Sequence, residues 1–181
     1  MSFPLCRDSR IAQFYDYWNG LRTCGGIPGL AAFDPIEIAP LLPCIWKMHW
    51  DEEAQDFVYG LAGEEILTAF ATPLRHRSLG EIYDHDVSET LRNRYQAICR
   101  TPGAFYARGQ IYRHLGRYGT GERLVLPLTD GQGRPRIVIG CTVYRTSQWP
   151  NPALRPPSPE PDLALFTTLD GAPLERVRAA G

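Results

Sequence analysis

Three strand-like segments that follow one another closely constrain the fold of this chain more than any other feature. They are Ala104–Leu115, Glu122–Leu128 and Arg136–Arg145. Successive side chains of a strand point to opposite faces, so Leu124, Leu126 and Leu128 share one face of the second segment. The connections at Gly116–Gly121 and Asp130–Gly133 are short enough for hairpins. The pattern predicts an antiparallel meander of three strands.

A second pair of strands and a set of helices precede the meander. Cys44–Trp50 and Phe57–Ala62 flank the acidic turn Asp51–Asp56, which predicts a hairpin. The helices expected after it are Gly63–Phe70, a turn at Leu79–Tyr83, and a longer helix from the capping-box pattern Asp86–Glu89 to Arg100. This order predicts an α+β fold with a five-stranded antiparallel sheet and short helices on one face.

An amphipathic segment at the start of the chain predicts an N-terminal helix over Ser9–Arg22. Ile11, Phe14, Trp18 and Leu21 recur at spacings of three and four, so they form one apolar stripe. The stripe must be covered, either by the chain's own sheet or by a partner. Phe14, Trp18 and Leu21 are therefore the candidate dimer or partner contacts, and both alternatives stay open.

A second helix start is predicted further along, where Asp34 stands at the N-cap, Pro35 at the first helical position and Glu37 at the third. Pro40 and Pro43 keep this helix short. The organisation predicted from these patterns is an N-terminal helical extension over residues 1–43, a sheet domain over 44–146 and a Pro-rich tail over 147–181. Within the tail, Pro150–Pro161 holds six prolines and favours an extended segment, and Leu163–Leu169 is suited to a further strand or a docking segment.

Charge and cysteine usage exclude several classes of function. The net charge of −1 over 181 residues gives no general attraction to nucleic acid. No apolar run approaches the ~20 residues of a membrane span, and MSFPLCRDSR has no apolar stretch typical of a signal peptide. We therefore expect a cytoplasmic location. The five cysteines are spread singly without CxxC spacing, which favours reduced thiols over a zinc site, and Cys44 and Cys141 lie in apolar runs that favour burial.

Short motifs in a shared order resemble a bacterial family of PAS domains, which are sensory and regulatory modules. In the first half these are Tyr17-Trp18, Leu21-Arg22, Ile27-Pro28, Phe33-Asp34-Pro35 and Leu41-Leu42-Pro43. Further on they are Asp56-Phe57, Tyr59, Leu61-Ala62-Gly63, Arg77-Ser78-Leu79, Tyr95, Pro102, Leu126-Pro127-Leu128 and Asp130-Gly131. The chain departs from the family pattern at Leu30, Gly60, Glu64 and His76; if those positions serve a ligand or contact shared by the family, this chain has lost or altered it.

The resemblance implies a ligand held between the inner face of the sheet and the helices. The candidate pocket residues are Trp46, Met48, Phe70, Tyr83, Tyr95, Tyr112, Leu126, Ile139 and Cys141. The alternative is that these side chains fill the core and leave no cavity. The cofactor is unknown. Haem would require a ligand such as His76 or His85, and a flavin photoadduct would require a cysteine, for which Cys99 stands in the wrong local context.

The function predicted is a sensory or regulatory PAS module rather than an enzyme. It is expected to bind a small ligand, a protein partner or both, and to act through dimerisation or through that partner. The expected partners are thus a second copy of the chain, a small molecule and a signalling protein, without a membrane or nucleic acid, and no metal site is predicted. Two alternatives remain: an adaptor with a filled core and no ligand, and a small enzyme with an unrecognised Cys/His site.

Overall fold

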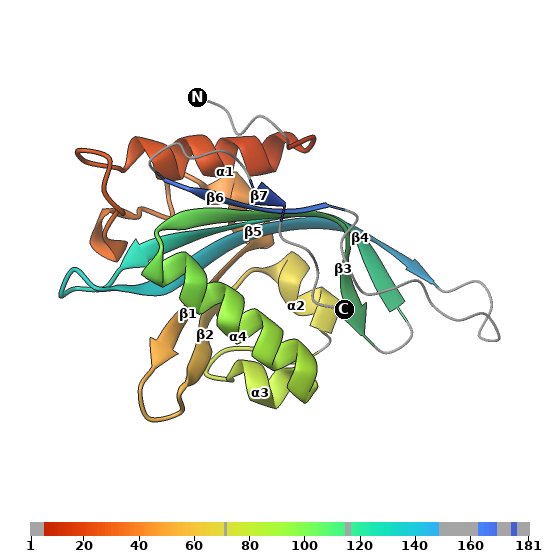
Figure 1. Cartoon of the computed structure of the whole chain (residues 1–181). Coiled ribbons are helices and arrows are strands. Elements are labelled where there is room, and N and C mark those ends of the chain that lie inside the picture. Colours follow the sequence, from red (N-terminus) through yellow and green to blue (C-terminus); the bar gives the residue numbers. More distant parts are fainter. Residues whose placement is uncertain (1–5, 71, 115–116, 149–162, 170–174, 177–181) are drawn as a thin grey trace.

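The computed structural model describes residues 6–70, 72–114, 117–148, 163–169 and 175–176, and for the side chains it leaves out 112–118, 146–148 and 175–176. One seven-stranded sheet runs through this part of the chain, in the order β2-β1-β5-β4-β3-β6-β7 (Figure 1). Every neighbouring pair of strands is antiparallel. Together with its helices, the sheet confirms the predicted α+β, PAS-like fold.

The five strands predicted from alternation form the first five places in that order. β3 (Gly103–His114), β4 (Arg117–Thr129) and β5 (Pro135–Gln148) make the predicted meander. β1 (Ile45–Asp51) and β2 (Asp56–Ala62) make the predicted hairpin, and β1 also pairs with β5. The first and last strands of the domain are therefore neighbours, which places β5 and β4 at the centre.

Two strands extend the sheet beyond this predicted set. β6 (Leu163–Thr168) pairs with β3, and β7 (Glu175–Arg176) pairs with β6. The prediction of a strand over Leu163–Leu169 is thus confirmed. The Pro-rich segment Pro150–Pro161 lies outside the described residues.

The helices differ from the predictions mainly at their starts. α1 (Ser9–Gly20) is capped by Asp8, and α2 (Glu64–Phe70) follows β2. α3 (Leu79–Ile82) carries the capping box, between Ser78 and Glu81, whereas α4 (His85–Arg100) begins one residue before the capping-box pattern predicted for it.

The helix predicted after Asp34 does not form. Residues 35–38 make a turn, and Ala39–Cys44 makes a 3₁₀ helix, η2, after a shorter one, η1 (Leu30–Ala32). The Asp34 carboxylate accepts a hydrogen bond from the backbone N–H of Ile36. Pro40 and Pro43 have no N–H to donate, which prevents a regular α-helix from continuing.

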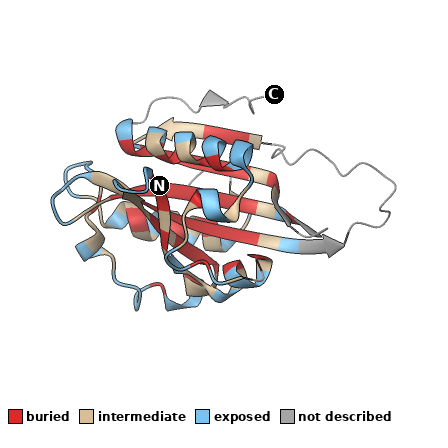
Figure 2. Cartoon of the chain, turned by 90° about the horizontal axis from the view of Figure 1, so that it is seen from below, coloured by how far each residue is buried: buried red, intermediate tan, exposed pale blue. Residues whose placement is uncertain are grey.

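The short helices α2, α3 and α4 cover one face of the sheet, as predicted, and the N-terminal helix α1 covers the other. Figure 1 shows α1 above the sheet and α2, α3 and α4 below it. Strands of the central sheet are buried along most of their length between these layers (Figure 2). None of the helices in the described part of the chain is both long and apolar enough to span a bilayer.

Candidate functional site

Trp46 is the central side chain on the face of the sheet below α4. It stands on β1 directly opposite Gly140 on β5, and its indole lies over that glycine. A Cβ atom at Gly140 would come within 2.2 Å of Trp46 Cζ2, so the absence of a side chain at 140 is what allows the ring to lie flat on the sheet. We call this face, with the α2–α4 helices packed on it, the inner face.

Polar groups lie beside Trp46 in the interior. The Trp46 indole N–H donates a hydrogen bond of 2.8 Å to Thr142 Oγ1, and the Arg123 Nε–H donates one of 3.2 Å to the same oxygen. The Arg123 guanidinium also lies 5.9 Å from the centroid of the Trp46 ring. These contacts fix the rotamer of Trp46, because its one donor is satisfied only in this orientation.

α4 supplies the opposite wall of the inner face. The ring of Tyr95 lies 5.7 Å from that of Trp46 and 5.6 Å from that of Phe57, between centroids. The Arg94 guanidinium stacks 4.2 Å from the centroid of Phe105, and burial lowers the pKa of Arg94. Aromatic rings thus occupy the space between β1, β2 and α4.

Asp56 fastens the helices to the sheet. It is 4% exposed at the start of β2, and its carboxylate accepts hydrogen bonds from Arg92 Nε at 3.0 Å and from the Gly80 backbone N–H at 2.9 Å. Arg92 belongs to α4 and Gly80 to α3, so one carboxylate holds two helices against one strand.

The nine predicted pocket residues do not share one face. The inner face includes Trp46, Met48, Phe70 and Tyr95, with Tyr83 packed against its edge. Leu126, Ile139 and Cys141 belong to the cluster under α1 on the other face, and the side chain of Tyr112 lies outside the described residues. In β4 and β5 it is Val125 and Val138 that face α4. The facing of these two strands was therefore predicted one residue out of register.

The structure selects between the two alternatives for the α1 stripe. Phe14 and Trp18 are fully buried against the chain's own sheet, and the Trp18 indole N–H donates a hydrogen bond of 2.9 Å to the Pro127 carbonyl. Leu21, at the C-cap of the helix, is partly exposed. Phe14 and Trp18 are therefore not available as a dimer or partner surface.

The histidines considered for haem lie at the surface. The side chain of His85 is 85% exposed at the first turn of α4, 3.9 Å from Glu89, and His76 is exposed in the segment before α3. Burial raises the pKa of Cys99 to about 12, which keeps this thiol protonated and a poor nucleophile. Among the residues with described side chains, no three metal-ligating groups gather into a site.

An open groove lies at the outer edge of β2, beside the stretch where Tyr59 pairs with residues 76–77. It has a volume of about 660 Å³ and is lined by Gly60, Leu61 and Ala62 of β2, Leu67 of α2, and residues 72–75. Leu61 and Leu67 are 41% and 38% exposed and give the groove apolar surface. No local sequence pattern indicates this groove, because it depends on how α2 packs relative to an edge strand.

Sequence reasoning also missed the polar residues of the inner face. Arg123 and Thr142 are 9% and 0% exposed in the two central strands. The sequence contains a sign of their burial, because each polar residue lies within or beside an apolar run. Arg123 begins the run Arg123–Leu128, and Thr142 lies within Ile137–Val143. A buried polar residue in a central strand must find a hydrogen-bond partner, and here the two find each other.

One of three comparisons with known proteins finds a match. Comparison with curated proteins and with solved structures finds no match. A family model described as PAS domain matches residues 7–143, from the residue before the α1 cap to the middle of β5. The matched stretch covers well over half of the chain and contains Trp46, Thr142 and the helices α2–α4. This chain therefore belongs to the PAS domain family.

Proposed function

We propose that this PAS domain is a regulatory module with an inner face filled by its own side chains, and that it passes its signal by protein–protein contact. One observation carries the proposal: Trp46 lies flat on Gly140, in the space where a PAS ligand is expected, and is held there by Thr142. The family is one of sensory and regulatory domains, so the open question is what occupies this space.

The packing around Trp46 supports a filled core. Tyr95 and Tyr59 make ring contacts with it, Phe57 packs edge-on against Tyr95, and all three are buried. Any ligand at this position would have to displace an indole that has both a satisfied hydrogen bond and aromatic neighbours. Such displacement costs the lost contacts of a Trp side chain, which is several kcal/mol in a packed core.

A second candidate is a small apolar ligand bound in the open groove beside β2. The groove volume of about 660 Å³ falls within the range of small-molecule sites. Its leucines supply apolar contact, and Arg75 supplies a charge at the rim. Trp46 is not among the residues that line this groove, so the two candidates predict different effects of mutation.

Native mass spectrometry of the freshly purified chain tests the first candidate directly. We expect the 20.4 kDa mass of the bare polypeptide, or twice that mass for a homodimer, and no visible absorbance band. A stoichiometric added mass, or a haem or flavin band, shows a bound ligand: one in contact with Trp46 contradicts a filled inner face, and one in the groove beside β2 supports the second candidate. A monomer at every concentration would contradict self-association and leave a different protein as the receiver.

Indole binding to a cavity variant sharpens the test. Trp46→Ala removes a side chain of the same shape as the probe, so indole should raise the melting temperature of this variant and leave that of the wild type unchanged. Trp50→Ala, at the exposed end of β1, is the matched control and should gain nothing. If Trp46→Ala does not fold, Trp46→Leu takes its place. Equal stabilisation of the wild type by indole would show that the inner face already has room for a ligand.

A further inference from the structure

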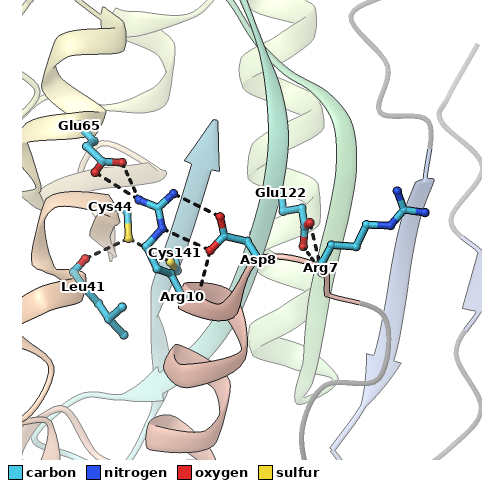
Figure 3. Close-up of polar contacts among 8 residues, drawn as sticks. All are labelled: Arg7, Asp8, Arg10, Leu41, Cys44, Glu65, Glu122 and Cys141. Atoms are coloured by element: carbon cyan, nitrogen blue, oxygen red, sulfur yellow. Dashed lines mark hydrogen bonds and ion pairs between the residues drawn. The ribbon is translucent and has the colours of Figure 1, made fainter. Parts of the chain in front are cut away.

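Two cysteines lie side by side on the α1 face of the sheet, far apart in sequence and outside the inner face (Figure 3). Cys44 ends η2 just before β1, and Cys141 stands in the middle of β5. Their sulfur atoms are 3.3 Å apart, and both side chains are buried. The neighbouring residue Ile45 pairs directly with Cys141 across the two strands, which explains why the thiols meet.

We propose that Cys44 and Cys141 form a site of reversible oxidation, at which a hydroperoxide converts the two thiols into a disulfide. The proposal does not rest on how the PAS domain passes its signal, because it concerns a different face of the sheet.

The geometry suits bond formation. A disulfide has an S–S length of about 2.05 Å, so the two sulfur atoms must approach by roughly 1.3 Å. Cys141 is held in a central strand between β1 and β4. Cys44, by contrast, belongs to the 3₁₀ segment Ala39–Cys44, whose hydrogen bonding is weaker than that of a strand. The adjustment can therefore come from the Cys44 side while the sheet stays in place.

The surrounding charges assign different roles to the two thiols. The hydrogen bond with Cys141 lowers the pKa of Cys44, burial raises it, and the Arg10 guanidinium lowers it further, so that the net shift is downward. The same hydrogen bond and burial raise the pKa of Cys141. Cys44 is therefore the thiolate nucleophile and Cys141 the resolving thiol. In the reduced state the Cys44 thiol also donates to the Leu41 carbonyl at 3.1 Å, a contact that ionisation removes.

The reaction balances with the hydroperoxide as the only oxidant. The Cys44 thiolate attacks one peroxide oxygen, the O–O bond breaks, and the other oxygen leaves as an alcohol or as water after taking a proton. The resulting sulfenic acid is then attacked by the Cys141 sulfur, the S–O bond breaks, and water leaves with the Cys141 proton. Two thiols lose two electrons in total, and the peroxide gains them.

A solvated ion pair lies beside Cys44. Arg10 of α1 and Glu65 of α2 form an ion pair of 3.3 Å, and Arg10 also binds Asp8, as Figure 3 shows. The side chains of Arg10 and Glu65 are 38% and 42% exposed, so this pair is solvated and weakly held. We expect the oxidant to reach the buried Cys44 thiol when this pair separates.

The test exposes the native full-length chain to hydrogen peroxide, followed by alkylation of the remaining thiols in denaturant and peptide mapping. We expect complete loss of the Cys44 and Cys141 thiols, a linked peptide pair containing both residues, and full recovery of the thiols with a dithiol reductant. Cys99 is the internal control, because it is buried on the inner face, away from the Cys44–Cys141 pair, and burial raises its pKa. It should stay reduced.

Variants keep the proposal falsifiable. Cys44→Ser and Cys141→Ser should each abolish the linked pair. If either fails to fold, the variant with Cys6, Cys24 and Cys99 replaced by Ser retains the pair alone and should lose two hydrogen atoms from its intact mass on oxidation. Oxidation of exposed Cys24 while Cys44 and Cys141 stay reduced would overturn the proposal. So would a linked pair that forms only in denaturant.

Discussion

The two faces of the sheet are both buried, but they are built from different chemistry. Under α1 the buried cluster is mostly aliphatic, with leucines and isoleucines of β4 and β5 against Ile11, Phe14 and Trp18. On the inner face, β1, β2, β3, α2 and α4 supply aromatic rings, with Trp46 and Tyr95 at the centre. One face of the sheet is thus covered mostly by aliphatic side chains, and the other by aromatic rings in fixed orientations.

Polar groups are placed differently on the two faces. Under α1 they gather at the N-terminal end of the helix, where Glu122 accepts hydrogen bonds from the Arg7 backbone N–H and the Tyr106 hydroxyl, and Arg10 binds Glu65. On the inner face they reach into the middle, at Thr142 and Arg123. Aliphatic packing tolerates small shifts, whereas hydrogen-bonded rings require one arrangement. We therefore expect the α1 face to supply stability and the inner face to be more sensitive to shape.

Removal of Trp18 should give the largest effect, because the α1 face depends on it most. Trp18→Ala deletes a fully buried side chain and its hydrogen bond to Pro127, and should lower the free energy of unfolding by about 3–5 kcal/mol. Trp50→Ala removes the same side chain where it is partly exposed, and should cost much less. Urea denaturation measures both. Equal losses would show that α1 does not stabilise the sheet as described.

The same comparison explains what could be predicted from the sequence. Strand and hairpin positions followed from alternation and turn residues, which are local signals. The facing of β4 and β5 did not, because a sheet covered on both sides has apolar residues at consecutive positions, as in Leu124-Val125-Leu126. The alternation of side chains then does not indicate which residues point to which face of the sheet. The predicted pocket residues Leu126, Ile139 and Cys141 accordingly lie on the α1 face.

The apolar pattern of α1 likewise did not predict the surface against which this helix packs. An apolar stripe shows that a helix needs a cover, but it does not say which surface supplies it. The docking of Trp18 depends on the Pro127 carbonyl, 109 residues further along the chain. Contacts of that range, like the pairing of Cys44 with Cys141, follow from the strand order and not from local sequence.

Loss of Asp56 should give the second largest effect and tests how the inner face is closed. Asp56→Ala leaves the Gly80 N–H and the Arg92 guanidinium without their acceptor, which should cost about 2–3 kcal/mol of unfolding free energy. Glu89→Ala, an exposed acid on the same helix α4, is the control and should change stability by less than about 0.5 kcal/mol. Denaturant unfolding of the two variants, measured side by side, gives both changes in the free energy of unfolding. If they lose the same amount, Asp56 does not hold α3 and α4 in place.

A methyl group added at Gly140 should show how sensitive the inner face is to a change of shape. Gly140→Ala places Cβ against the Trp46 ring, which must move, and should cost about 1–3 kcal/mol. The tryptophan fluorescence and near-UV circular dichroism should also change, since the indole loses its fixed position. Gly131→Ala, where a Cβ meets nothing within 4 Å, should leave both signals unchanged. An unaltered spectrum in Gly140→Ala would contradict a rigidly packed inner face.

The smallest effect should come from Asp8, at the polar end of the α1 face. Asp8 accepts a hydrogen bond from the Arg10 backbone N–H at 2.9 Å and caps α1, so Asp8→Ala should cost about 1 kcal/mol at neutral pH. Asp16→Ala, an exposed site on the same helix, controls for the helix itself and should stay within about 0.5 kcal/mol.

The cost of Asp8→Ala should also depend on pH. Partial burial raises the pKa of Asp8, but the hydrogen bonds and charge of Arg10 outweigh it, and the net pKa lies below 3.8. A carboxylate with a lowered pKa in the folded state stabilises the fold above its unfolded pKa, and this contribution is lost as the pH falls through the folded value. The difference between wild type and Asp8→Ala should therefore be largest above pH 3.8 and should shrink on further acidification. A difference that is constant with pH would mean that Asp8 acts through packing alone, and the α1 face would then depend on apolar contact at both of its ends.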